Sequence, residues 1–187
     1  AHFSYGISYT KGSLGKVYEL DYDNANVKQL ADDIYNFKVS PDKFKKHVTF
    51  ISGPPGTRKT SLVKSLAVKF AKRLIVIDSS AVGNDDLIKL NDEVDENTFI
   101  LFDDVDAITG VIGKRTEGAV NTQQQPVQSK LTLGALLAFC DGMTTPNGLC
   151  VFFVTNHIEY FDAAVTRDKR VDSYVILDKQ GKDTAEI

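Results

Sequence analysis

The sequence predicts an α/β fold in which helices cover both faces of a parallel sheet. Short apolar runs alternate along the chain with stretches of helical periodicity. The runs are nearly continuous in Val, Ile and Phe, which is typical of strands buried on both faces. The expected strands span residues 47–51, 74–77, 99–102, 150–154 and 174–177.

Three stretches between these runs have the spacing of amphipathic helices. Residues 60–73 carry apolar side chains on one face, residues 131–139 form a second helix, and residues 27–37 form a third that stops before Pro41. Residues 109–130 have no sustained period and contain several glycines and a Gln run. We expect a mobile surface loop there, with an irregular but ordered loop as the alternative.

The composition is that of one soluble domain. The chain has 187 residues, of which 42% are hydrophobic and 25% charged. Its net charge of −3 gives no electrostatic reason to expect nucleic acid as a partner. Its two cysteines suit a reducing, intracellular compartment. No apolar run reaches the roughly 20 residues of a membrane span, so we expect any membrane segment to lie outside this chain.

The first strand runs directly into a loop that is typical of phosphate binding. The loop reads Gly53-Pro54-Pro55-Gly56-Thr57-Arg58-Lys59-Thr60-Ser61 and is followed by a helix, nearly matching the Walker A pattern G-x-x-x-x-G-K-[ST]. In such a loop, backbone N–H groups converge on phosphate oxygens and the helix adds its positive N-terminal end. We expect Lys59 to bridge the β- and γ-phosphates and Thr60 to ligate Mg²⁺.

One position departs from the pattern, because Arg58 stands where a glycine is expected. An arginine there could crowd the phosphates or strain the backbone. It could instead point outward or add a cation to the γ-phosphate. Weak nucleotide binding, or a Gly/Pro turn with no ligand, therefore stays an alternative.

Two carboxylates follow the third apolar run, as in a Walker B motif. Asp103 at the end of this strand can hold Mg²⁺, and Asp104 can orient or deprotonate an attacking water. By itself such a pair is also common in a polar turn, but the phosphate loop upstream favours the site. We expect Asp106 to support the geometry of the loop rather than to act chemically.

The fourth strand ends in another polar group. Asn156 is placed to hold the attacking water, with a capping or turn role as the alternative. We interpret His157 as a neutral surface residue rather than a general base. Further along, Arg167 and Arg170 precede the last strand. Taken alone, these two arginines read as a solvated charged turn.

These motifs together resemble the ATPase module of the AAA family, the ATPases associated with diverse cellular activities. The likeness is carried by residues 53–61, 101–106 and 154–172 and extends roughly from Val17 to Ile187. The segment from Leu131 to Gly142 is similar to one branch of the family, that of the mitochondrial inner-membrane chaperone that translocates the Rieske iron–sulfur protein. That branch also ends its Walker B motif in an aspartate.

The resemblance implies a P-loop NTPase core with a five-stranded parallel sheet of order 5-1-4-3-2, flanked by helices. It implies ATP and Mg²⁺ as ligands and a homo-oligomeric ring, a hexamer or heptamer. By matching position, Asp103 would assist the metal, Asp104 would polarise water and Asn156 would sense the γ-phosphate. Arg167 and Arg170 would act on the ATP of the neighbouring subunit, where a guanidinium stabilises the charge of phosphoryl transfer.

The expected function is ATP binding and hydrolysis that drive remodelling or translocation of a protein client. The alternative is a nucleotide-responsive scaffold whose hydrolysis is impaired by Arg58. A nucleic-acid-stimulated ATPase fits the net charge least well. The expected location is the mitochondrial inner membrane if the branch resemblance holds, and the cytoplasm otherwise.

Two departures from the family shape these expectations. Residues 1–187 read as one AAA core domain that lacks the family's N-terminal segment and its small C-terminal helical lid. Many threading members carry an aromatic pore loop, whereas the nearest match here, Ala81-Val82-Gly83, has no aromatic residue. We therefore expect a folded client rather than an unfolded polypeptide.

Overall fold

The computed structural model describes residues 17–40, 46–108, 131–141, 147–161 and 171–178. The expected loop at 109–130, Arg167 and Arg170 lie outside these residues.

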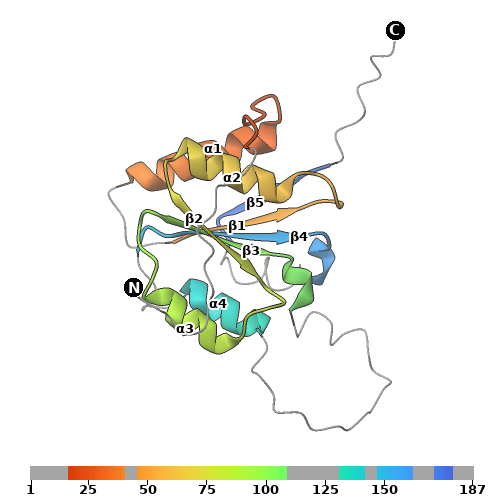
Figure 1. Ribbon diagram of the computed structural model, residues 1–187. Helices are drawn as coiled ribbons and strands as arrows, with labels where there is room; N and C mark the ends of the chain where they lie inside the picture. The colour runs from red at the N-terminus through yellow and green to blue at the C-terminus, as the bar shows by residue number, and fades with distance from the viewer. Residues whose placement is uncertain (1–16, 41–45, 109–130, 142–146, 162–170, 179–187) are drawn as a thin grey trace.

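Five parallel strands form one sheet between two helical layers (Figure 1). The strands are β1 (His47–Ser52), β2 (Arg73–Asp78), β3 (Thr98–Asp103), β4 (Cys150–Thr155) and β5 (Ser173–Ile176). Their spatial order is β2-β3-β4-β1-β5, which confirms the order 5-1-4-3-2 read from the other edge. All pairings are parallel, so the carboxyl ends of the strands meet at one edge of the sheet.

Helices α1 (Ala25–Val39) and α2 (Lys59–Lys69) cover one face, and α3 (Asn84–Asn91) and α4 (Leu133–Asp141) cover the other (Figure 1). The alternation of strand side chains divides the core into two clusters. Val151 and Phe153 of β4 belong to the α3–α4 cluster, while Phe152 and Val154 belong to the α1–α2 cluster. The near-continuous apolar runs are thereby explained, since both faces of the central strands are buried.

The helix after the phosphate loop is shorter than expected and ends at Lys69, because Ala71 adopts a left-handed conformation with φ 50°. The N–H groups of Ala71 and Lys72 donate to the carbonyls of Val68 and Ala67, the pattern of a Schellman cap. Arg73 then opens β2 instead of closing the helix. The prediction of a helix over 60–73 is therefore wrong at its C-terminal end.

The apolar pattern does not predict α3, in which Leu87 and Leu90 are the buried side chains. In the part of the chain that the structure describes, every helix is too short or too polar to cross a membrane. Both cysteines, Cys140 and Cys150, are buried thiols outside any disulfide, and burial raises the pKa of Cys150 to about 12.

Candidate nucleotide-binding site

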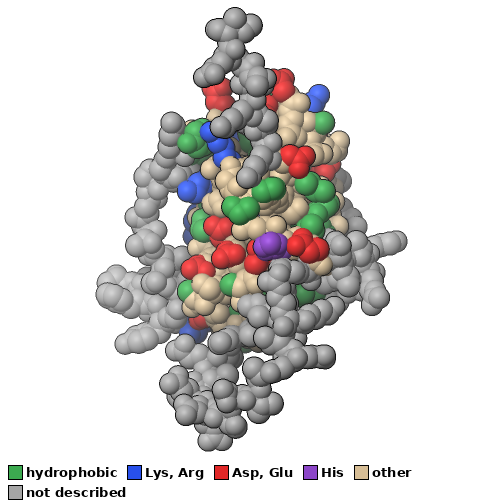
Figure 2. Space-filling view, turned by 90° about the vertical axis from the view of Figure 1, so that its right-hand side faces the viewer, with side chains coloured by type: hydrophobic (Ala, Val, Ile, Leu, Met, Phe, Trp, Pro, Cys, Tyr) green, Lys and Arg blue, Asp and Glu red, His purple; other side chains and the backbone are tan. Residues whose placement is uncertain are grey.

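The carboxyl edge of the sheet brings together residues from three separate motifs. A pocket of about 370 Å³ opens there between the phosphate loop and the ends of β3 and β4. It is lined by Pro55, Gly56, Arg58, Lys59, Thr60, Ser61, Asp103, Asp104, Val154, Thr155 and Asn156. Figure 2 views the molecule from the side toward which β1 and β4 point in Figure 1, and acidic side chains gather across the middle of this face.

The backbone of the phosphate loop depends on its two glycines. A Cβ on Gly53 would lie 2.1 Å from the carbonyl oxygen of Leu177, so only glycine lets the loop pass this close to the end of β5. Gly56 has φ +83°, in the left-handed region. The glycines therefore shape the turn that carries the chain from β1 into α2.

Lys59 is buried, with 7% of its surface exposed. Its Nζ donates to the carbonyl oxygens of Gly53 and Pro54 at 2.8 Å each and to Thr57 Oγ1 at 3.3 Å. Burial lowers the pKa of Lys59, while the charges of Asp106 and Asp103 oppose that shift. The ammonium is thus held at the mouth of the pocket by oxygens of its own loop, which phosphate oxygens can replace.

Thr60 and Asp103 form the oxygen pair that a divalent cation would require. The Thr60 hydroxyl donates to both carboxylate oxygens of Asp103 at 3.3 Å. Within the described residues, no group of three His, Cys, Asp or Glu side chains could hold a metal ion alone. The pair suits Mg²⁺, which commonly takes one or two protein oxygens together with phosphate and water.

Asp104 lies at the end of β3 in a left-handed conformation with φ 52°. Its N–H donates to Asp103 Oδ1 at 3.1 Å, and the residue as a whole is exposed. Partial burial of the carboxyl raises its pKa, and the charges of Asp106, Asp103 and Asp78 raise it further. A raised pKa makes this carboxylate a better proton acceptor than an ordinary aspartate.

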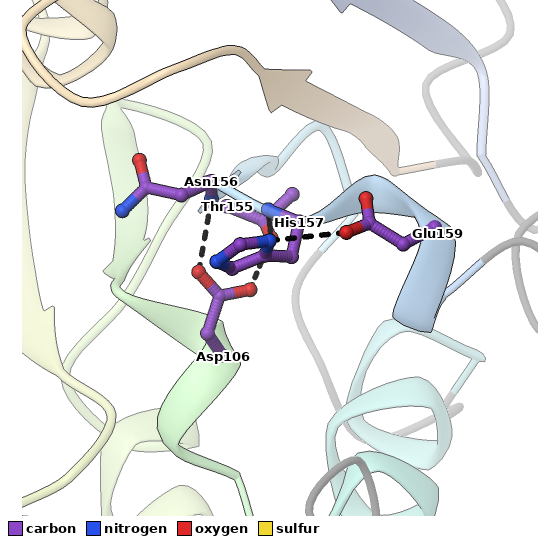
Figure 3. Close-up of polar contacts among 5 residues, drawn as sticks. All are labelled: Asp106, Thr155, Asn156, His157 and Glu159. Carbon is purple, nitrogen blue, oxygen red and sulfur yellow. Dashed lines mark hydrogen bonds and ion pairs between the residues drawn. The ribbon is translucent and has the colours of Figure 1, made fainter.

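Asp106 connects the end of β3 to the end of β4 (Figure 3). Its carboxylate accepts hydrogen bonds from the Thr155 hydroxyl and, at 2.9 Å, from the backbone N–H of Asn156. The side chain of Asn156 extends away from Asp106 in the same view. Asp106 thus fixes the backbone that carries Asn156, while the expected support of its own loop stays a prediction.

His157 is exposed and contacts Glu159 and Thr155. Its Nδ1 lies 3.0 Å from Glu159 Oε1 (Figure 3). Its backbone N–H donates to Thr155 Oγ1 at 2.9 Å. These contacts agree with the interpretation of a surface histidine.

A second cavity, of about 410 Å³, adjoins the phosphate loop on its α1 side. Its walls are the segment 18–21, the start of α1, the loop and the end of β5. The residues are Tyr18, Glu19, Leu20, Asp21, Asn24, Val27, Pro55, Gly56, Thr57, Arg58, Ser61, Leu62, Ser65, Leu177 and Asp178. No sequence pattern marks segment 18–21, so reasoning from the sequence missed this cavity.

Arg58 keeps the conformation that glycine would have, with φ 60° and ψ 34°. Its guanidinium carbon lies 4.6 Å from the centre of the Tyr18 ring. Of the alternatives open for this residue, the structure therefore shows backbone strain together with a side chain that stacks on an aromatic ring.

The comparison with protein families matches residues 49–179 to the family described as "ATPase family associated with various cellular activities (AAA)". This match begins within β1 and extends past β5, so it contains every motif of the site. The chain belongs to the AAA family.

Individual AAA relatives resemble the chain at modest identity. An Arabidopsis thaliana AAA-ATPase is 26% identical over 84% of this chain and 37% of its own length. The mitochondrial chaperone BCS1 of Bos taurus is 32% identical over 64% of this chain and 28% of its own length. The ATP-dependent zinc metalloprotease FtsH of Halothermothrix orenii is 28% identical over 82% of this chain and 26% of its own length.

Because BCS1 chaperones are among the relatives, the expected likeness to the branch that includes BCS1 is confirmed. The chain spans only 37% of the length of the Arabidopsis thaliana AAA-ATPase. What the AAA relatives do as whole proteins is therefore carried to this chain only as a proposal.

Proposed function

We propose that this chain is one AAA core domain that binds ATP with Mg²⁺ at the carboxyl edge of its sheet and hydrolyses it to drive protein remodelling or translocation. The observation that carries the proposal is the convergence of the Lys59 ammonium and the Thr60–Asp103 pair on one pocket of about 370 Å³. Family membership supports the nucleotide as ligand.

The triphosphate would lie along the loop from Gly53 to Ser61, where the N-terminus of α2 favours anions. Lys59 would exchange its loop carbonyls for β- and γ-phosphate oxygens. Thr60 and Asp103 would hold Mg²⁺, which when bound neutralises charge on the phosphates. The base and ribose would occupy the cavity of about 410 Å³ beside the loop.

Asp104 and Asn156 would act on the attacking water. Both line the pocket of about 370 Å³, which we call the phosphate pocket, from the ends of β3 and β4. Asp104 would accept a proton from the water or orient it, and the Asn156 amide would hold the water near the γ-phosphate. Asp106 would keep Asn156 in place through its bond to the backbone N–H.

We further propose a homo-oligomeric ring, a hexamer or heptamer, in which Arg167 and Arg170 reach the ATP of the neighbouring subunit. We expect Arg167→Ala or Arg170→Ala to lower turnover by about 10³-fold while the ATP affinity stays nearly constant. Steady-state hydrolysis and calorimetric titration on each variant measure the two quantities. An equal loss of both would argue against action across an interface.

The relatives favour a protein client. Two of them, from Bos taurus and Schizosaccharomyces pombe, are named as mitochondrial chaperones, which favours a mitochondrial location for this chain. The client itself stays unidentified.

A nucleotide-responsive scaffold is the second candidate, because Arg58 has a left-handed backbone where a glycine is expected and lines the pocket proposed for the phosphates. Calorimetric titration with ATP and Mg²⁺, alongside a hydrolysis assay, separates the two. The ATPase proposal predicts saturable binding by the parent chain together with turnover. Saturable ATP binding by the parent without turnover, with turnover restored in Arg58→Gly, would favour the scaffold.

A further inference from the structure

Arg58 lies where the two cavities of the site meet. It lines both the phosphate pocket and the larger cavity beside it. Its left-handed backbone leaves the loop in the shape that a glycine would give it. The side chain therefore leaves the loop toward Tyr18, with the guanidinium carbon 4.6 Å from the ring centre.

Tyr18 belongs to a segment that forms one wall of the larger cavity, together with Glu19, Leu20 and Asp21. The Ser65 hydroxyl of α2 donates to the Tyr18 carbonyl at 2.6 Å and to the Ser61 carbonyl at 3.0 Å. The backbone of this wall is thus tied to α2, while its aromatic ring is tied to the phosphate loop through Arg58. Two independent contacts hold the same residue.

We propose that Arg58 is a positioning residue for the nucleoside part of the ligand: by stacking on Tyr18, it holds segment 18–21 as the wall of the cavity that takes a purine base and its ribose. This inference rests on the proposed function. It gives the arginine a use at a position where a phosphate loop ordinarily requires glycine. The guanidinium acts on the base side of the loop, and the phosphates are left to Lys59 and the backbone.

The geometry favours this role over direct contact with the phosphates. A guanidinium offers its flat face to an aromatic ring, and lysine cannot reproduce that contact. Glu19 and Asp21 line the same cavity as Arg58 and Tyr18. Removing Arg58 should therefore loosen the wall of the cavity and leave the triphosphate contacts intact.

The test compares two ligands, ATP–Mg²⁺ and tripolyphosphate–Mg²⁺, of which the second has no base or ribose. Calorimetric titration is done on the parent, Arg58→Gly, Arg58→Lys, Tyr18→Leu and the double variant Arg58→Gly/Tyr18→Leu. We expect each single variant to weaken ATP binding about three- to tenfold, with the double variant no weaker than the worse single one. Tripolyphosphate affinity should not change.

Tyr22→Leu is the matched control. Tyr22 directly follows segment 18–21, and the centre of its ring lies 5.2 Å from the Lys69 ammonium, but it does not line the larger cavity. We expect it to bind ATP like the parent. A loss equal to that of Tyr18→Leu would overturn the inference, as would tighter binding of both ligands by Arg58→Gly, which would mean that the arginine crowds the phosphates.

A second measurement needs no nucleotide. The chain has no tryptophan, so Tyr18→Trp introduces a single fluorescent reporter at the contact. We expect acrylamide quenching of this reporter to rise when Arg58→Gly is added, because the guanidinium no longer shields the ring. Unchanged quenching would overturn the inference even if ATP binds. The proposed function is tested separately by titrating Lys59→Ala with ATP–Mg²⁺ and tripolyphosphate–Mg²⁺. If this variant binds both ligands as tightly as the parent, the proposed function is overturned instead.

Discussion

A lysine whose pKa is lowered by burial lies at each end of the strands, one at the amino edge of the sheet and one at the carboxyl edge. The two lysines are nevertheless suited to different tasks. At the amino edge, the Lys38 ammonium donates to the carbonyls of Glu96 and Gly148 at 2.7 Å each. At the carboxyl edge, the Lys59 ammonium donates to the carbonyls of Gly53 and Pro54 at 2.8 Å each. The chemistry of the two groups is the same.

The difference lies in what the carbonyls belong to. Glu96 and Gly148 come from two separate connections, so Lys38 joins parts of the chain that are far apart in sequence. Gly53 and Pro54 belong to the loop that leads into Lys59, so its bonds can be exchanged without separating any elements. The bonds of Lys59 therefore leave room for a ligand in the adjoining pocket, whereas those of Lys38 hold two connections together.

The amino edge also holds a chain of internal hydrogen bonds. His47 Nε2 lies 2.9 Å from Ser173 Oγ, which in turn donates to Asp33 at 3.0 Å. Asp172 accepts from the N–H of Val48 at 2.8 Å. The carboxyl edge holds exposed acids. It also holds two of the three non-glycine residues that have positive φ in the described part of the chain, Arg58 and Asp104, while the third, Ala71, lies just before β2 at the amino edge.

The largest expected effect at the carboxyl edge is on turnover. Asp104→Asn removes the proton acceptor with the raised pKa, so we expect hydrolysis to fall by about 10²–10⁴-fold. ATP affinity should stay within about threefold of the parent, since the side chain keeps its size. The exposed Asp92 at the end of α3 is the control, and Asp92→Asn should hydrolyse ATP normally. Parent-like turnover in Asp104→Asn would remove this residue from the chemistry.

The next effect is on nucleotide affinity. Lys59→Met removes the ammonium from the phosphate pocket, and we expect the Kd for ATP–Mg²⁺ to rise about 100-fold. The free energy of unfolding should also fall, by about 1–3 kcal/mol, because the bond of Lys59 to the Gly53 carbonyl is buried and that carbonyl loses its donor. Titration and urea unfolding measure the two quantities.

Lys38→Met should affect stability alone. Its bond to the Glu96 carbonyl is exposed and its bond to the Gly148 carbonyl part-buried, so the free energy of unfolding should fall by about 0.5–1.5 kcal/mol. ATP affinity should match the parent. If Lys38→Met weakened ATP binding as much as Lys59→Met, the distinction between the two edges would be wrong.

The smallest expected effect is a pH dependence at the amino edge. Burial lowers the pKa of His47 from its ordinary value of 6.5, while Asp172 and Asp33 oppose the shift and Lys38 adds to it. A group with a lowered pKa when folded binds more protons when unfolded, so stability is full above pH 6.5 and falls as the pH drops toward the folded value. His47→Gln should flatten this slope in urea unfolding between about pH 5 and pH 7. An identical slope in both chains would contradict it.

Much of this arrangement could be predicted from the sequence. The five strands have apolar runs because both of their faces are buried, and Lys59, Thr60 and Asp103 follow strand ends that meet at one edge. Helix α3 could not be predicted, since Leu87 and Leu90 alone give no clear period. The end of α2 was missed because Ala71 takes a conformation that favours glycine.

Contacts between distant segments were also beyond prediction. Tyr18 stacks on Arg58, which lies forty positions further along the chain, and no sequence motif marks the pair. Asp106 could be given a geometric role in general terms, but its partners, Thr155 and Asn156, depend on the register of β3 and β4. Motifs reveal the groups that touch the ligand, and only the fold reveals what positions them.

The central claim is that the carboxyl edge binds nucleotide and the amino edge does not. Calorimetric titration of ATP–Mg²⁺ into the parent, Lys59→Met and Lys38→Met tests it most directly, with circular dichroism to show that each chain is folded. The account predicts saturable binding by the parent and by Lys38→Met with equal Kd, and a Kd about 100-fold higher in Lys59→Met. Parent-like binding by folded Lys59→Met would contradict it.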